Sequence, residues 1–341
     1  MRRAVFLVGV VAAVVVALAR AAVRRMRRGP TLPSWTWGEE LFVAGFRAFS
    51  TRSARDLEML SPRSDGPRMS LGRTRRGALD VDEVHLGGIR AERYRPRGPA
   101  SGTIVYLHGG GFVTGTIGIE RQLAAEQAMV SNCETYNVAY RLAPRHPFPA
   151  ALDDAVAAYQ AVLDRGADPA TTILFGGSAG AALALATLVQ IRDQGLARPA
   201  GAVLLSPYAD FTFSGDSIAA NSNVDMLPLR DLASIWGPAY VGDADPADPL
   251  VSPALAELDG LPPLLILAGG AETLLSCAER IATNARRAGV DTQFTVYPEK
   301  VHGWMLLSKL SASVAAVAEV NAWIDARLGA TAPDARHGTM T

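Results

Sequence analysis

The sequence predicts an α/β fold built on a mostly parallel sheet of eight strands, with helices on both faces and a helical cap. From residue 81 onward, short apolar runs rich in Val, Ile and Leu alternate with longer helical segments, as in buried parallel strands joined by crossover helices. Two glycine-rich sequences directly follow such strands. One polar insertion interrupts the alternation, and we expect it to cover the carboxyl ends of the strands, where ligands bind in open α/β sheets.

Composition describes a globular chain with balanced charge. Of the 341 residues, 49% are hydrophobic and 19% charged, which excludes a disordered protein and allows one large core. Lys plus Arg and Asp plus Glu both number 33, so we expect no nucleic acid partner. Cys133 and Cys277 are too few for a disulfide framework and match no metal-ligand spacing. We predict that both are buried as small apolar side chains and that no metal is bound.

Residues 1–30 form an apolar segment bounded by arginine, which predicts membrane association through residues 4–23. The apolar run Ala4–Ala19 would rise about 24 Å as a helix, short of the roughly 30 Å hydrocarbon core. Five arginines follow it: Arg20, Arg24, Arg25, Arg27 and Arg28. Three interpretations are open. The segment is a membrane anchor with the folded domain on the cytoplasmic side, a cleaved export signal, or a helix lying on a membrane or on its own domain, as in a soluble cytoplasmic protein.

The next segment, residues 31–79, predicts an N-terminal cap helix followed by a loop. A joint rich in Gly and Pro at 29–34 precedes a helix expected over Trp35–Met59, whose apolar residues recur at helical spacing. A polar loop rich in Arg and Pro follows at 61–77. This segment therefore adds a cap helix before the sheet begins.

Residues 80–328 carry the alternating pattern of the main domain. The predicted strands, of which the first two form a hairpin, are Val81–Leu86, Ala91–Arg95, Thr103–Leu107, Glu134–Tyr140, Thr172–Phe175, Ala202–Leu205, Leu264–Ala268 and Gln293–Tyr297. The predicted helices are Ala150–Leu163, Ala179–Arg192, Leu274–Ala288 and Ser311–Arg327. The cap insertion spans 207–260, with helical pieces around Arg230–Tyr240, and a polar tail occupies 329–341. The last strand is expected at a sheet edge, where pairing with a second copy would give a homodimer.

The sequence Gly176-Gly177-Ser178-Ala179-Gly180 fits the pattern G-x-S-x-G and stands between a predicted strand and a predicted helix. In that context the serine occupies a tight turn, where small neighbours let the backbone pass and leave the hydroxyl exposed. The N-terminus of the following helix favours negative charge that develops on a substrate. We therefore predict Ser178 as a nucleophile, with Gly176 and Gly180 supporting the turn.

The sequence His108-Gly109-Gly110-Gly111 directly follows the third predicted strand. A serine hydrolase needs backbone N–H donors aimed at an oxyanion, and glycines let the backbone approach a substrate closely. We predict that the N–H groups of Gly110, Gly111 and Ala179 form this oxyanion hole, with His108 and Gly109 supporting the loop. A phosphate-binding loop is excluded because no Gly-Lys-Ser/Thr sequence follows.

A base and an acid complete the predicted site, and chain order selects them. In folds with this nucleophile turn, the order along the chain is nucleophile, acid and histidine. His302 is the only histidine after Ser178 in a loop expected to be ordered, since His337 lies in the polar tail. Glu272 is the only carboxylate in the turn after the strand that ends at Ala268. It would accept the imidazole N–H and stabilise the imidazolium that forms.

Further motifs accompany these residues in a fixed order: Tyr140-Arg-Leu-Ala-Pro144, His146-Pro-Phe-Pro-Ala-Ala-Leu-Asp-Asp154, Ser206-Pro-Tyr-Ala-Asp210, Asp245–Pro253 and Gly270-Ala-Glu-Thr-Leu-Leu275. With the two glycine motifs, they resemble the hormone-sensitive-lipase-like branch of the α/β-hydrolases, especially its bacterial esterases. The resemblance covers residues 80 to 328 and implies the α/β-hydrolase fold. Some members of that branch use Glu as the acid, which is consistent with Glu272. Two departures, Gly177 where the branch often has Asp and Arg145 where it often has Glu, affect local hydrogen bonding rather than the triad.

The resemblance implies a carboxylic ester hydrolase that forms an acyl-enzyme on Ser178 and needs no cofactor. Most members of the branch prefer short- to medium-chain acyl esters, so a small-molecule or lipid ester is the expected substrate. Hydrolysis of a lactone, carbamate or amide by the same triad is an open alternative, because these reactions differ only in pocket shape. A non-catalytic ligand-binding relative is the other alternative, which the complete set of Ser178, Glu272 and His302 disfavours.

Overall fold

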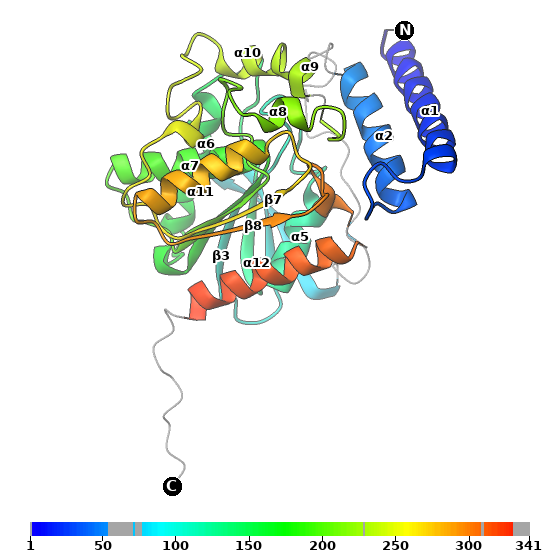
Figure 1. The fold of residues 1–341 in the computed structure, drawn as a ribbon. Helices are drawn as coiled ribbons and strands as arrows, with labels where there is room; N and C mark the ends of the chain where they lie inside the picture. Colours follow the sequence, from blue (N-terminus) through cyan, green and yellow to red (C-terminus); the bar gives the residue numbers. More distant parts are fainter. Residues whose placement is uncertain (1, 54–70, 72–76, 228, 308–309, 330–341) are drawn as a thin grey trace.

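Eight strands form a single sheet in the computed structural model, which describes residues 2–53, 71, 77–227, 229–307 and 310–329 (Figure 1). The strand order is β1-β2-β4-β3-β5-β6-β7-β8. β2 runs antiparallel to β1 and β4, and all other neighbours are parallel. The strands are β1 (Leu79–Leu86), β2 (Ile89–Pro96), β3 (Gly102–Leu107), β4 (Cys133–Val138), β5 (Thr172–Gly177), β6 (Gly201–Leu205), β7 (Leu264–Gly269) and β8 (Thr292–Tyr297).

Helices cover both faces of the sheet, so that two apolar cores form. On one face α6 (Ala150–Asp164), α7 (Ala179–Asp193) and α11 (Leu275–Arg287) pack against the strands. On the other face lie α5 (Arg121–Val130) and α12 (Ser311–Gly329), which Figure 1 shows crossing the sheet on the side away from α7. The central strands are buried on both sides, which explains why their sequences are continuous apolar runs rather than alternating ones.

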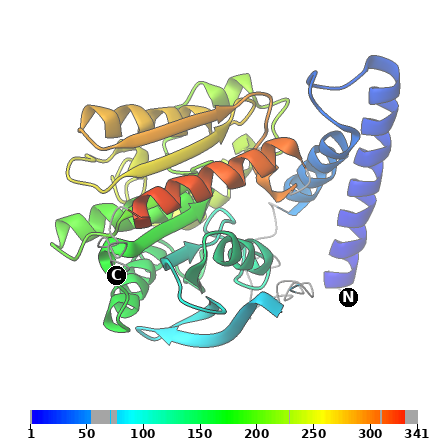
Figure 2. The same ribbon diagram turned by 90° about the horizontal axis from the view of Figure 1, so that it is seen from below.

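The insertion after β6 and the N-terminal helices lie near the carboxyl ends of the parallel strands. The insertion contains α8 (Ser217–Ala220), α9 (Leu229–Ala233) and α10 (Trp236–Val241). The N-terminal segment forms α1 (Arg2–Arg28) and α2 (Trp37–Ser53), and α1 lies along the outer side of α2 in both views (Figures 1 and 2). Within the part of the chain that the structure describes, no helix combines the length and the apolar character needed to cross a membrane.

A small apolar cluster joins α2 and its preceding joint to the loops of the main domain. Trp35 and Val43 pack with Met226 of the insertion, Ala271 after β7 and Val301 after β8. All five side chains are buried. The N-terminal segment is therefore packed directly against the loops that follow the last two strands.

The predicted fold class is confirmed, and every predicted strand and main-domain helix ends within two residues of the observed bounds. The helix expected over Trp35–Met59 is observed as α2, and residues 54–59 lie outside the described residues. The same holds for nearly all of the polar loop at 61–77 and of the tail at 329–341. Among the described residues, α5 and the four-residue α8 were not predicted. α5 begins without a side-chain cap and contains few large apolar residues, so it carries weak sequence signals.

Candidate active site

Ser178 lies on a sharp turn between β5 and α7, at the open end of the parallel sheet. Its backbone has φ 55° and ψ −118°, a conformation that L-residues rarely adopt. The turn depends on close backbone approach, because a Cβ at Gly180 would overlap the carbonyl group of Leu107. The Ser178 N–H donates to the carbonyl oxygen of Leu205 at 2.8 Å, which ties the turn to β6. The chain thus holds this serine in a strained and well-anchored position.

His302 is the side chain that meets Ser178. It comes from the loop after β8 and is 6% exposed. Its Nε2 lies 3.0 Å from the Ser178 hydroxyl oxygen, within hydrogen-bond reach of a nucleophile and its base. The structure therefore brings together two residues that are 124 positions apart in the sequence.

Glu272 is fully buried beside His302, in the turn after β7. Its Oε1 accepts hydrogen bonds from the Ser206 hydroxyl at 2.6 Å and from the Gly269 N–H at 2.8 Å. Its Oε2 lies 3.6 Å from Nδ1 of His302, and neither of these two atoms has a hydrogen-bond partner among the described residues. The free oxygen and the free ring nitrogen therefore face each other, slightly beyond hydrogen-bond distance.

Two carboxylates control the protonation of His302. Burial acts to lower the pKa of the imidazole, but the carboxylate of Glu272 and the negative charge of Asp225 raise it by more. The pKa of His302 is therefore above its ordinary value. The pocket therefore stabilises the positive imidazolium relative to that of a free histidine side chain.

The loop after β3 places two glycine N–H groups beside the serine turn. Gly110 has φ 119°, and a Cβ there would overlap the backbone of Thr114, so only glycine fits. Among the described residues, no intramolecular hydrogen bond occupies the N–H groups of Gly110, Gly111 or Ala179. Gly109 lies close to Ser178: a Cβ added to Gly109 would be 3.6 Å from the Cβ of Ser178. Three backbone donors without an intramolecular partner thus lie in the two turns that meet beside Ser178.

His108 has a structural place in this loop. Its ring is buried and stacks on Tyr140 with centroids 4.2 Å apart, and Nδ1 lies 2.8 Å from the Gly109 carbonyl oxygen. Burial lowers the pKa of His108 to about 4, so the ring is neutral at pH 7. The Gly109 N–H donates to Glu120 at 2.8 Å. These contacts hold the loop while leaving the next two N–H groups free.

Sequence reasoning missed the carboxylates and hydroxyl that support the site. Glu120 accepts a hydrogen bond from the glycine loop, and the Ser206 hydroxyl donates one to Glu272. Asp225 accepts a hydrogen bond from the backbone N–H of His302 at 2.9 Å. Ser206 was part of a motif, but nothing in the pattern gave it a partner. At Gly177, an added Cβ would have no neighbour within 4 Å, so this departure from the family pattern leaves open space.

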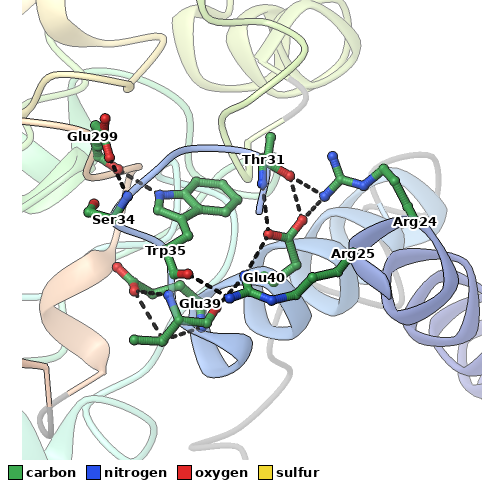
Figure 3. A network of polar contacts seen from close by, with 9 residues as sticks. Arg24, Arg25, Thr31, Ser34, Trp35, Glu39, Glu40 and Glu299 are labelled. Atoms are coloured by element: carbon green, nitrogen blue, oxygen red, sulfur yellow. Dashed lines mark hydrogen bonds and ion pairs between the residues drawn. The ribbon is translucent and has the colours of Figure 1, made fainter. Parts of the chain in front are cut away.

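The loop that carries His302 is also bound to the joint before α2. Trp35 Nε1 donates to the Glu299 carbonyl oxygen at 2.7 Å, and the Ser34 N–H donates to the Glu299 carboxylate at 2.8 Å (Figure 3). Lys300 pairs with Glu39 of α2 at 2.6 Å. Figure 3 shows that the network continues through Glu40 to Arg24 and Arg25 of α1. Polar contacts therefore run from α1 to the residues just before His302.

Metal ligands do not gather anywhere in the described part of the chain. No group of three His, Cys, Asp or Glu side chains there is placed to hold an ion. Cys133 and Cys277 are both buried free thiols.

Known proteins are similar to this chain in sequence and in fold. A family model described as the α/β-hydrolase fold matches residues 104–306. The chain is 39% identical to an acetyl-hydrolase of Streptomyces hygroscopicus over 67% of this chain and 76% of that protein. It is 35% identical to an esterase of Acinetobacter venetianus over 64% of this chain and 73% of that protein. Among solved structures, a hormone-sensitive-lipase homologue from a metagenome library aligns with a TM-score of 0.74 and 32% identity, covering 85% of this chain and 98% of that one.

The chain therefore belongs to the α/β-hydrolase fold family. Within it, the chain is a member of the hormone-sensitive-lipase-like branch, and it is an enzyme of the esterase class. The resemblance inferred from the motifs is confirmed.

Proposed function

We propose that the chain hydrolyses carboxylic esters with Ser178 as nucleophile, His302 as base and Glu272 as acid. The observation that carries this proposal is the 3.0 Å contact between the Ser178 hydroxyl and Nε2 of His302 at the open end of the sheet. His302 takes the serine proton as the hydroxyl attacks the ester carbonyl, and it gives that proton to the leaving alcohol. Water then attacks the acyl-enzyme by the same steps.

The oxyanion of each tetrahedral intermediate would be bound by the N–H groups of Gly110, Gly111 and Ala179. These donors lie in a preorganised loop and at the start of a 15-residue helix, so they need no rearrangement when charge develops. His108, Gly109, Gly176 and Gly180 would keep the two turns in place. No step in this mechanism requires a metal or a cofactor.

Short- to medium-chain acyl esters are the proposed substrates. Trp236 of α10 lies against the glycine loop, since a Cβ at Gly111 would come within 2.5 Å of its ring. Phe112 stacks on Tyr240, and the Phe211 ring packs against both at a tilt. These rings fill space beside the oxyanion donors, which favours a small acyl group over a long one. We propose that the insertion 207–260 and the segment 31–79 act together as the cap over a catalytic domain at 80–328.

The test is turnover of p-nitrophenyl esters from acetate to palmitate by the wild type and by Ser178→Ala. We expect hydrolysis of the short esters, declining beyond the medium chains, and a fall in kcat of about 10³-fold or more in the variant. Ser131→Ala, which alters a buried serine at the end of α5, is the matched control and should keep full activity. Activity retained by a folded Ser178→Ala protein would refute the assignment.

The same assay separates the alternatives. If a folded wild type hydrolyses none of these esters, it is tested on a lactone, a carbamate and an anilide with the same acyl group. Turnover of one of these substrates would mean that the same triad cleaves a bond other than that of a simple ester. Absence of turnover on all of them would favour a ligand-binding role.

We also propose that α1 lies on the surface of a membrane and that the edge strand β8 pairs with its copy in a homodimer. The first idea rests on exposed valines along α1 and on the arginines at its end. The second rests on the edge position of β8, where Val296 is partly exposed. In this arrangement the catalytic domain would stay on the cytoplasmic side, beside lipid esters.

A further inference from the structure

A buried carboxylate outside the three proposed catalytic side chains touches two of their loops. Asp225 lies in the insertion between α8 and α9 and is 0% exposed. Among the described residues it forms no ion pair with Lys or Arg. Burying a carboxylate without a cation is costly unless hydrogen bonds satisfy it. Its position therefore needs an explanation.

Asp225 accepts hydrogen bonds from both sides of the site. Oδ1 accepts a hydrogen bond from the backbone N–H of His302 at 2.9 Å. Oδ2 accepts hydrogen bonds from both the backbone N–H and the hydroxyl of Thr273 at 2.7 Å. Oδ1 also accepts the N–H of Met226 at 2.8 Å. Thr273 directly follows Glu272 in the chain. One carboxylate thus bridges the loop that carries the base and the loop that carries the acid.

The insertion strengthens this bridge with a second contact. The Asn221 side chain donates to the carbonyl oxygen of Glu272 at 2.8 Å, and the Asp225 N–H donates to the carbonyl oxygen of Asn221 at 2.9 Å. The insertion therefore holds both the carbonyl oxygen and the N–H of the peptide group that joins Glu272 to Thr273. Because Asp225 also binds His302, the separation of the two loops is set by the insertion as well as by the sheet.

The charge of Asp225 also acts on the imidazole. Among the described residues, the charged groups that act on His302 are Glu272 from the turn after β7 and Asp225 from the insertion, and the neutral Ser178 hydroxyl faces Nε2 of the ring. Both carboxylates raise the pKa of His302. Among the described residues no Lys or Arg forms an ion pair with the Asp225 carboxylate, although Arg47 of α2 donates to the Asp225 backbone carbonyl oxygen at 3.3 Å.

We propose that Asp225 is a positioning residue for the ester hydrolysis, a role that rests on the proposed function of Ser178, His302 and Glu272. It sets the distance between the base loop and the acid loop, and its charge stabilises the imidazolium together with Glu272. The insertion is then more than a cover over the substrate, because it supplies a second carboxylate to the catalytic histidine.

The test compares Asp225→Asn with the wild type on p-nitrophenyl butyrate across pH 5 to 9. An Asn side chain presents one acceptor and one donor, so it can satisfy the His302 side or the Thr273 side but not both. We expect kcat to fall by about 10- to 100-fold with KM little changed, as for a small misplacement of catalytic groups. The acid limb of kcat/KM should move to lower pH, because the loss of a negative charge makes the imidazolium easier to deprotonate.

Two matched variants separate positioning from folding. Asp154→Asn removes another buried carboxylate, which binds Arg141 and does not face His302, so the acid limb should stay in place. Thr273→Val removes a single donor and keeps the charge of Asp225, so kcat should fall by less and the limb should not move. If Asp225→Asn does not fold, an unchanged kcat in Thr273→Val overturns the proposal.

The other outcomes are equally decisive. If the acid limb of kcat/KM does not move in a folded, active Asp225→Asn protein, the proposed effect of the charge on His302 is wrong. If kcat equals that of the wild type, the proposed positioning of the two loops by Asp225 is wrong. Failure of the proposed function gives a different result, since the wild type would then be inactive or Ser178→Ala would be active.

Discussion

At the level of single residues, Glu272 uses its two oxygens in different ways. Oε1 is held by Ser206 and Gly269, whereas Oε2 is free to face the imidazole. A glutamate is one methylene longer than an aspartate, and the two hydrogen bonds fix this longer side chain. The remaining oxygen lies 3.6 Å from Nδ1 of His302, and such contacts commonly shorten when a substrate is bound.

We predict that Glu272→Gln lowers kcat by about 10³- to 10⁴-fold, because a neutral amide neither fixes the imidazole tautomer nor balances the imidazolium. The acid limb of kcat/KM should also move to lower pH. In the wild type the carboxylate raises the pKa of His302, so activity develops only as pH rises through that higher value. Glu279→Gln, an exposed position on α11, is the control and should match the wild type. Equal losses in both variants would contradict a specific role for Glu272.

At the level of elements, the loop between β8 and His302 depends on the N-terminal segment. Its Glu299 and Lys300 bind the joint before α2 and α2 itself, and His302 follows two residues later (Figure 3). Burial acts to raise the pKa of Glu39, but Lys300 and Thr36 lower it by more. The ion pair with Lys300 is therefore formed at neutral pH, and its contribution to stability is lost as pH falls and Glu39 is protonated.

We predict that Lys300→Met lowers the free energy of unfolding at pH 7 by about 2 kcal/mol, because it leaves the largely buried Glu39 carboxylate without its charged donor. The loss of stability should be smaller in acid, where Glu39 is neutral. The variant should also have a lower kcat than the wild type, because His302 lies two residues after Lys300. Arg327→Met breaks an ion pair with the exposed Asp291 and should cost less than about 1 kcal/mol. Chemical denaturation at pH 7 and at pH 4 measures both, and equal effects of the two variants would refute the prediction.

The strands and main helices could be predicted from the sequence because each carries its own local pattern. β7 is an unbroken apolar run, and the serine turn follows β5 with glycines on both sides. The strand order could not be predicted, since the place of β4 between β2 and β3 is decided by contacts across the whole domain. Asp225 was missed for the same reason. It stands among several aspartates of a polar insertion, and only the folded chain brings it to His302 and Thr273.

At the level of the whole molecule, α1 is the one long helix of the described chain with an exposed apolar face. Val8, Val11, Val15, Val23 and Met26 are 43% to 70% exposed and follow one another at helical spacing. Another side of α1 packs on α2, where a Cβ added at Gly45 would lie 3.4 Å from Leu18 and 3.8 Å from Val14. The first 28 residues contain basic but no acidic side chains, although the chain as a whole has a formal net charge of zero. Any attraction to an anionic surface must therefore come from this local cluster of arginines.

We predict that the full chain sediments with vesicles containing anionic phospholipid and binds zwitterionic vesicles more weakly. A helix with arginines at its ends and an apolar face lies in the plane of such a surface, where burial of the valines adds to the charge attraction. Val11→Asp together with Val15→Asp should abolish binding and leave the hydrolysis of soluble esters unchanged. Val314→Asp, which places the same charge on an exposed position of α12, should bind as the wild type does. If the α1 variant still binds, another surface is responsible. If no form binds, α1 has a different partner, and its exposed valines call for a second protein or a second copy of this chain.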